Sequence, residues 1–339
     1  MDQTPVAEPT YDFKSAQKQF SRIGLALVAF FAATYAMAFL AELILVYVFA
    51  VQVFPAWLSV VVSCVGMYGI GVPVVCLCLR GMKSSAPPRG EVRIGTLCIL
   101  FLIAYALMYV GNIAGMVSTA LLEKATGLVV TSTAIDLLPE LPWYITLLYA
   151  VLIGPFFEEL VFRKMILDRT RVYGEKTAIL FSALLFGFFH MNLQQFFYAV
   201  LIGLVFGYLY LRTGKLSACW VLHSLFNFFG GLLPSLLMQY VDYDALLSAD
   251  TPEAMLEQVS ENPIGVALVM LYGMLVMCLT LVGSVLFLLY RKRLHFAAAA
   301  HTLPSDSEAT TAFVNVGVIL FVALCVLLPM IGAAMVQFG

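Results

Sequence analysis

The sequence predicts an all-α, polytopic transmembrane helical bundle with about nine spans and its N-terminus inside. Of its 339 residues, 62% are hydrophobic and only 11% are charged, whereas a soluble domain carries about 25% charged residues. The mean hydropathy is +0.98. Apolar stretches near the roughly 20 residues that cross a bilayer recur along the whole chain. The chain is therefore expected to be an integral membrane protein.

The predicted spans follow one another with short polar loops between them. The first begins after residues 1–22 and is longer than the roughly 7–15 apolar residues of a signal peptide, so we expect it to be retained. The fifth and sixth are short and meet at residues 190–195. The nine spans are residues 23–50, 57–79, 94–121, 143–163, 177–192, 196–212, 216–239, 264–289 and 312–336.

The distribution of charge sets the orientation. Almost all Lys and Arg residues lie before the first span or in every second loop, and acidic residues collect in the other loops. Since short basic loops face the cytoplasm, nine spans place the N-terminus inside and the C-terminus outside. The net charge of −2 argues against a nucleic-acid partner. The lipid bilayer is the expected surroundings.

Few ionisable residues fall inside the spans. Each costs about 2.5–3.5 kcal/mol on insertion scales, so such residues are candidates for function. Five of the six lie between positions 158 and 223. The six are Glu42, Glu158, Glu159, Arg163, His190 and His223.

Helical spacing places three of the charged residues, Glu158, Glu159 and Arg163, on two different faces of one helix. Glu159 and Arg163 are four residues apart on one face, with the acid first, which favours an ion pair. Glu158 lies about 100° around the helix and is left to face a polar cavity. The residues Gly154-Pro155 should bend the helix just before it. A purely structural ion-pair cluster that ties helices together is the equally weighted alternative.

Two further pairs have the same spacing. Phe186 and His190 are four residues apart, as are His223 and Asn227. A lone intramembrane histidine can simply make an interhelical hydrogen bond. A glutamate, two histidines and an asparagine on three helices, however, form a group that can bind and activate a water molecule.

Together these residues resemble a known family. Glu158-Glu159-Leu-Val-Phe-Arg163 resembles the EExxxR motif of the CPBP intramembrane proteases, Phe186-Gly-Phe-Phe-His190 their FxxxH motif, and His223-Ser-Leu-Phe-Asn227 their HxxxN motif. This family contains the CAAX-prenyl endoprotease and bacterial bacteriocin-processing and self-immunity (Abi) proteins. The resemblance covers roughly residues 140–235.

The resemblance implies an endopeptidase that hydrolyses a peptide bond in a membrane-associated protein or peptide. By similarity, Glu158 and His190 would position and deprotonate the attacking water. His223 and Asn227 would stabilise the oxyanion, as an imidazole and an amide N–H can. The remaining motif residues, Glu159, Arg163 and Phe186, would hold the geometry of the site.

A zinc ion is the open question. Glu158, His190 and His223 could supply the three protein ligands of a catalytic zinc. The H-E-x-x-H pattern of zinc proteases is absent from the sequence, and Asn227 suits an oxyanion better than zinc. Since the family is described both as metalloproteases and as glutamate-dependent proteases, we prefer the metal-free mechanism and keep Zn²⁺ as the alternative.

Two other functions compete with the protease. A membrane immunity or regulatory protein could use the same fold without catalysis. A proton-coupled transporter would need a matching polar half, such as an inverted repeat, and the sequence shows none. The expected location is a bacterial plasma membrane, and whether the substrate is prenylated stays open because one sequence does not show it.

The chain is expected to have four parts. Residues 1–22 form a disordered cytoplasmic tail and residues 23–135 the N-terminal transmembrane helices. Residues 136–240 form the CPBP-like catalytic core. Residues 241–339 contain an acidic outer loop and the C-terminal transmembrane helices.

Overall fold

A computed structural model describes residues 13–51, 53–129, 141–239, 259–296 and 308–338, together with the single positions 241, 251 and 253. Every regular element in these ranges is a helix, so the all-α prediction is confirmed. Most of the predicted acidic outer loop lies outside the described residues. The division of the chain into four parts stays a prediction. Its first boundary, at residue 22, differs from the start of the first helix, as described below.

The described helices follow the predicted spans closely. Several are built from consecutive α-, π- and 3₁₀-helical pieces. In chain order they are α1 (Phe13–Tyr47); α2 (Ala56–Cys64), η1 (Val65–Gly71) and α3 (Val72–Cys78); α4 (Ile94–Thr126); α6 (Trp143–Thr146), η3 (Leu147–Ile153), α7 (Gly154–Glu159), η4 (Leu160–Leu167), α8 (Asp168–Thr170) and η5 (Arg171–Tyr173); α9 (Glu175–Phe189); α10 (Leu193–Thr213); α11 (Leu216–Asn227), η6 (Phe228–Leu232) and α12 (Leu233–Met238); α15 (Pro263–Tyr290) and η7 (Arg291–Arg293); α16 (Glu308–Phe313); and α17 (Val316–Phe338).

The span count needs one correction. Eight helices in the described part of the chain are long and apolar enough to cross a membrane. The predicted span 177–192 corresponds to α9, which has only 15 residues and is therefore about 22 Å long, shorter than the roughly 30 Å hydrocarbon layer. Sequence hydropathy does not distinguish such a helix from a span, because both kinds of helix are apolar. The side chains of α9 are covered by other helices, whereas those of a span face lipid.

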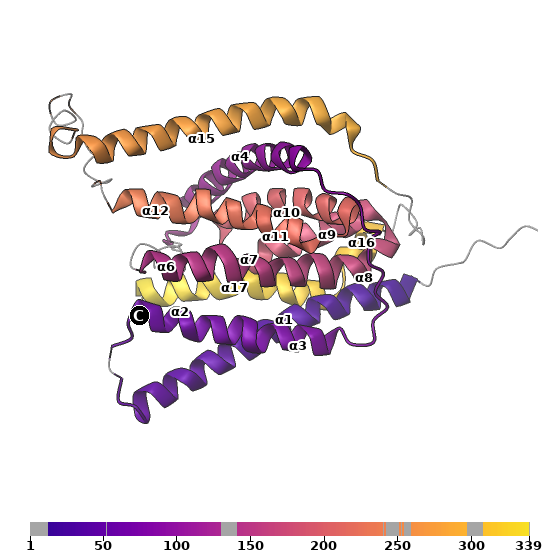
Figure 1. Cartoon of the computed structure of the whole chain (residues 1–339). Helices are drawn as coiled ribbons and strands as arrows, with labels where there is room; N and C mark the ends of the chain where they lie inside the picture. The colour runs from indigo at the N-terminus through magenta and orange to yellow at the C-terminus, as the bar shows by residue number, and fades with distance from the viewer. Residues whose placement is uncertain are drawn as a thin grey trace, which may run out of the picture.

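Helices α7, α9, α10 and α11 form the centre of the bundle (Figure 1). Helices α4 and α15 lie on one side of this centre, and α1, α2–α3 and α17 lie on the other. One buried cluster joins α1, α3, η4, α9 and α17, and a second joins α4, α9, α10 and α11. Helix α9 contributes to both clusters, so it is enclosed by protein.

The N-terminal boundary also differs from the prediction. Residues 13–22, predicted as part of a disordered tail, form the start of α1. Ala16, Phe20, Ile23 and Leu27 recur at helical spacing and are buried against the bundle. This apolar stripe begins at Ala16, before the continuous apolar stretch that starts at residue 23. A prediction from hydropathy alone therefore places the start of the helix too late. Residues 1–12 lie outside the described part of the chain.

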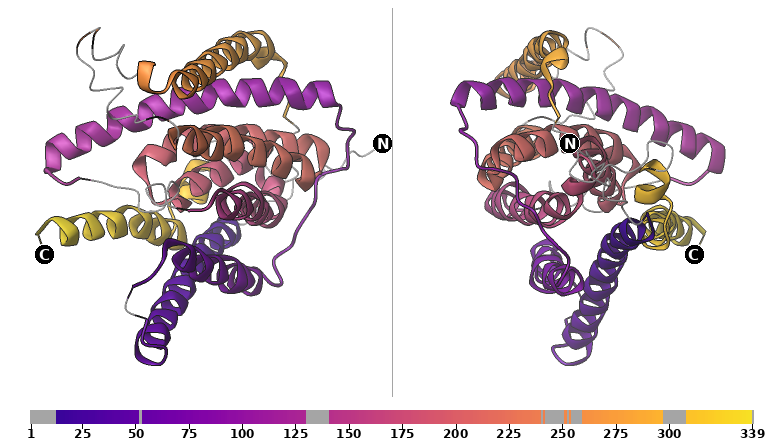
Figure 2. Two further views of the ribbon diagram at one scale, coloured as in Figure 1. Left: turned by 60° about the vertical axis from the view of Figure 1, so that its left-hand side comes forward. Right: turned by 90° about the vertical axis from the view of Figure 1, so that its right-hand side faces the viewer.

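The far half of α1 projects away from the other helices (Figure 2). Glu42 lies on this half and is exposed, about 30 Å along the helix from Arg22. It therefore sits near the outer boundary of the hydrocarbon layer, and of the six ionisable residues predicted inside spans it is the one remote from the site.

Within the described ranges, four π-helical segments interrupt the long helices: η1, η3, η4 and η6. Three of them are followed by a proline as the second residue of the next helix: Pro73, Pro155 and Pro234. Proline has no N–H and its ring clashes with the carbonyl one turn back, which favours the wider i→i−5 pattern just before it. π-Helical segments are rare in proteins as a whole, but those that occur are often found at functional sites.

The missing proline N–H leaves a carbonyl without its helical partner, and side chains supply the hydrogen bond. Five residues before Pro155, the Ala150 carbonyl accepts from Asn227 Nδ2 at 2.7 Å. Five residues before Pro234, the Phe229 carbonyl accepts from the Tyr272 hydroxyl at 2.6 Å. Irregular backbone inside a membrane is tolerated only with such compensation.

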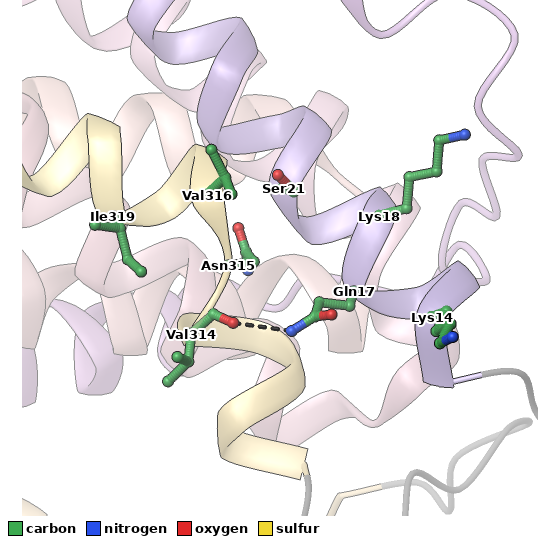
Figure 3. Close-up of a pocket in the computed structure, with 8 residues that line it drawn as sticks. All are labelled: Lys14, Gln17, Lys18, Ser21, Val314, Asn315, Val316 and Ile319. Atoms are coloured by element: carbon green, nitrogen blue, oxygen red, sulfur yellow. Dashed lines mark hydrogen bonds between the residues drawn. The ribbon is translucent and has the colours of Figure 1, made fainter.

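The first and the last described helices are joined at a break between α16 and α17 (Figure 3). Gln17 Nε2 donates to the Val314 carbonyl at 2.9 Å, and the Gly317 N–H donates to Ser21 Oγ at 3.0 Å. The Asn315 side chain caps α17 by accepting from the Val318 N–H at 3.1 Å. A shallow cavity of about 390 Å³ opens beside this junction.

Reporter fusions test the predicted orientation. A reporter fused after Gly339 is expected outside, and one fused at Ser305 inside. Although α9 is shorter than a span, Glu175 at its start pairs with Arg212 at the end of α10, so the two helices leave and return on the same side and the alternation of the loops is kept. Helix α17 is long enough to cross the membrane once between the two reporters. Accessibility of each reporter in intact cells is the measurement. Finding both reporters on the same side would remove the ninth predicted span.

Candidate active site

The two adjacent glutamates lie on α7, the short α-helix between the π-helical segments η3 and η4. Glu159 is completely buried, whereas the Glu158 side chain is 17% exposed. The two carboxylates therefore occupy different surroundings, as the 100° angle between neighbouring helical residues predicts.

The predicted ion pair is present. Arg163 Nε lies 2.9 Å from Glu159 Oε2 and Nη2 lies 3.4 Å from Oε1, with both side chains at 0% exposure. Arg163 Nη1 also donates to Ser182 Oγ at 3.2 Å, and the Phe186 ring lies 5.1 Å from the guanidinium carbon. A buried ion pair is tolerated when its remaining donors are satisfied in this way.

His223, on α11, is held between the two glutamates. Its Nδ1 lies 3.0 Å from Glu159 Oε1, and its Nε2 lies 3.6 Å from Glu158 Oε2. Because Glu159 pairs with Arg163, its carboxylate is the natural acceptor for an Nδ1–H, and Nε2 is then the nitrogen directed at Glu158. Glu159 thus serves both Arg163 and His223, which the spacing within one helix did not indicate.

Phe186 connects the two histidines. Its ring meets the His190 ring edge-on with centroids 4.8 Å apart, and the His223 ring at 5.8 Å. His190 follows the last residue of α9, and its Nδ1 lies 2.8 Å from the Phe186 carbonyl oxygen. This contact uses one ring nitrogen of His190 and leaves Nε2 for chemistry.

The chain reverses immediately after His190. Met191 has φ 50°, in the left-handed region that residues with a side chain seldom adopt, at a cost on the order of 1–2 kcal/mol. Asn192 then starts α10, with its side chain accepting from the N–H groups of Gln194 and Gln195. Strain next to a candidate catalytic residue is typical of functional sites.

Asn227 lies one helical turn beyond His223. One amide N–H is engaged with the Ala150 carbonyl, as described above. From the same helix, the Trp220 indole N–H donates to the Leu152 carbonyl at 2.9 Å. Helix α11 is therefore fastened to the irregular backbone of η3, and Asn227 keeps a second N–H and its oxygen for other partners.

The structure brings the predicted residues into one group. Glu158, Glu159, Arg163, Phe186 and His223 are linked by the contacts above, and His190 lies within electrostatic range of Glu158 and His223. The Glu158 carboxylate makes no hydrogen bond with a described residue. Like His190 Nε2 and the second N–H of Asn227, it is therefore free to meet water or a substrate.

The geometry does not favour the zinc alternative. Within the described residues, no three His, Cys, Asp or Glu side chains are grouped so that they could hold one metal ion. In His223 and His190 the Nδ1 atoms face Glu159 and the Phe186 carbonyl, which leaves Nε2 of each ring for a water molecule or, as in histidine zinc ligands, for a metal ion. As they are oriented, these side chains are not grouped as zinc ligands, and Zn²⁺ stays the alternative to the metal-free mechanism.

Comparison with known proteins covers the same part of the chain. Residues 140–229 match a family described as "Type II CAAX prenyl endopeptidase Rce1-like". The Bacillus subtilis (strain 168) protein named "Putative membrane peptidase YdiL" is 27% identical over 162 residues, which is 46% of this chain and 64% of that protein. No solved structure matches.

All seven predicted site residues fall inside residues 140–229, from Glu158 to Asn227. The matched family and the relative's name both agree with the resemblance carried by the EExxxR, FxxxH and HxxxN motifs. The chain is a multi-pass membrane protein, and both comparisons support the resemblance of this segment to the CPBP family.

Proposed function

We propose that this protein is an intramembrane endopeptidase that cleaves a peptide bond in a membrane-associated protein or peptide with a water molecule activated by Glu158. One observation carries the proposal: Glu158 is partly exposed and has no hydrogen-bond donor among the described residues, beside a second glutamate that is fully neutralised. A solely structural cluster has no need of the free carboxylate.

The proposed reaction uses the residues as they lie. Glu158 accepts a proton from water held between it and His190, and the hydroxide attacks the peptide carbonyl carbon. The oxyanion that forms accepts hydrogen bonds from the second N–H of Asn227 and from Nε2–H of His223. The His223 ring carries a proton on both nitrogens in this step, since Nδ1–H donates to Glu159. When the carbon–nitrogen bond breaks, Glu158 returns the proton to the leaving amine, which yields a carboxylic acid and an amine.

The cluster behind Glu158 has a separate proposed role. Glu159 and Arg163 cancel each other's charge, and Glu159 fixes the orientation of the His223 ring through Nδ1. His223 Nε2 is thereby directed toward Glu158. We further propose residence in a bacterial plasma membrane, which agrees with the Bacillus subtilis relative.

Cleavage of defined peptides tests the proposal. The purified full chain, reconstituted in liposomes, is incubated with three probes: a peptide with a farnesylated C-terminal cysteine motif, the same peptide without the lipid, and a single transmembrane segment. Mass spectrometry detects new termini. Cleavage of at least one probe by the wild type, and by Glu42→Gln but not by Glu158→Gln, is the expected result.

Absence of cleavage for all three probes, at the level of the Glu158→Gln protein, contradicts the endopeptidase and favours the immunity-type scaffold. The choice of probe also separates substrate classes. Cleavage of the farnesylated peptide alone indicates recognition of the lipid, whereas cleavage of the transmembrane segment indicates lateral entry from the bilayer.

Metal removal is expected to leave activity intact. Glu158 and His190 can activate water without a metal ion, and the described side chains do not converge on a zinc site. The measurement is the cleavage rate after exhaustive treatment with a membrane-permeant chelator such as 1,10-phenanthroline, with its non-chelating isomer as control. Loss of activity that zinc specifically restores would contradict the metal-free mechanism.

A further inference from the structure

Glu158 shares a small space with a tyrosine from outside the matched segment. A Cβ atom placed on Gly154 would lie 3.0 Å from the Tyr149 carbonyl oxygen, 3.1 Å from the Tyr68 hydroxyl oxygen and 3.9 Å from Glu158 Oε1. The hydroxyl and the carboxylate therefore border the same point above α7. Glycine at position 154 leaves this point open.

The Tyr68 side chain is held firmly in this position. Its ring stacks on the Phe157 ring with centroids 4.8 Å apart and planes at 10°, and the Tyr149 ring lies 6.4 Å away. Tyr68 belongs to the π-helical segment η1, which is tied to α1 by a hydrogen bond from the Thr34 hydroxyl to the Gly66 carbonyl at 3.3 Å. These contacts fix the position of the Tyr68 ring and of the helix that carries it.

Neither polar group makes a hydrogen bond with a described residue. The nearest polar neighbour of the Glu158 carboxylate is His223 Nε2, at 3.6 Å, and the Glu158 side chain is 17% exposed. A hydroxyl donor and a carboxylate acceptor that border one point can be met together by a substrate carbonyl and its attacking water.

The site is otherwise short of donors for an oxyanion. One N–H of Asn227 is engaged by the Ala150 carbonyl, and Nδ1 of His223 faces Glu159. Oxyanion stabilisation depends on donors that are already in position when charge develops. Tyr68 is a neutral O–H donor on the Glu158 side of the site.

We propose that Tyr68 is a further catalytic residue, whose hydroxyl donates a hydrogen bond to the carbonyl oxygen of the scissile peptide as this oxygen becomes an oxyanion. The inference rests on the proposed peptidase function. No proton is transferred in this step: the Tyr68 O–H bond stays intact, and Glu158 handles the proton of the water. The first transmembrane helices thereby contribute chemistry to a site whose motifs lie entirely in residues 140–229.

Tyr68→Phe tests the proposal because it removes only the hydroxyl oxygen and keeps the ring stacked on Phe157. Loss of one oxyanion donor is expected to lower kcat about 10²-fold, with KM changed less than threefold and the thermal unfolding midpoint unchanged. The matched control is Tyr144→Phe, which removes the hydroxyl of an exposed tyrosine on α6 and should leave kcat unaltered.

The outcomes separate this inference from the function on which it rests. Wild-type kcat in Tyr68→Phe, with Glu158→Gln inactive, overturns the role of Tyr68 and leaves the peptidase standing. A fall in kcat that is accompanied by a lower unfolding midpoint or by a large rise in KM indicates a structural or binding role and also overturns it. A wild-type protein that cleaves none of the probes overturns both.

Discussion

Replacing Glu158 with glutamine is expected to lower cleavage by about 10²–10⁴-fold, the usual contribution of a general base. Glutamine keeps the shape of the side chain and can still hydrogen-bond, but it does not accept a proton from water. Because Glu158 makes no ion pair within 3.5 Å and is partly exposed, the protein should remain folded. The measurement is kcat together with the thermal unfolding midpoint.

Glu42→Gln is the matched control, since it makes the same change on an exposed residue of α1 far from the site and should leave kcat unaltered. If Glu158→Gln cleaved normally while Glu159→Gln was folded but inactive, the roles assigned to the two glutamates would be exchanged. If neither substitution changed the activity, the proposed mechanism would be wrong.

Replacing Arg163 with alanine is expected to destabilise the protein by about 3–5 kcal/mol, because it leaves a buried charge without its partner. Glu159 is fully buried and receives two hydrogen bonds from the Arg163 guanidinium. Ser182 also loses the donor that faces its hydroxyl. The amount of folded protein in the membrane and its thermal unfolding midpoint should both fall.

Lys164→Ala is the matched control. Lys164 is the next residue, and like Arg163 it pairs with an acid four positions away, in this case Asp168. In its pair with Asp168 the lysine side chain is 46% exposed and the aspartate 1%. Asp168 keeps the hydrogen bond from the Tyr210 hydroxyl, so loss of Lys164 should cost less than loss of Arg163. The double variant Glu159→Gln with Arg163→Gln should recover part of the stability. It should not recover cleavage, because His223 loses the carboxylate that orients it. Stability equal to wild type in Arg163→Ala would contradict this account.

Contacts within one helix could be predicted from the sequence. The i, i+4 spacing of Glu159 and Arg163 indicated their ion pair, and the same spacing placed Phe186 against the His190 ring. Such contacts depend on the pitch of a single helix, which any apolar span of sufficient length adopts. The position of Glu158 off this face followed from the same geometry.

Contacts between helices could not be predicted in this way. The bond between Glu159 and His223 joins positions 64 residues apart, and the approach of Tyr68 to Glu158 joins different helices of the bundle. Both depend on how whole helices pack, for which the sequence has no local signal. The prolines at 73, 155 and 234 did carry a signal for the π-helical segments, because each removes an N–H from a helix interior.

The hydrogen bonds between Gln17 and Val314 and between Ser21 and Gly317 have a consequence for how the protein is made. Their partners are 297 and 296 residues apart, so at about 5–20 residues per second the ribosome needs roughly 15–60 s to add the second after the first. During that interval the face of α1 that later receives α17 has to be covered by lipid, by a chaperone or by the insertion machinery. The aromatic cluster around α9 is completed only when α17 arrives, so the nascent chain should acquire protease resistance late and in a single step.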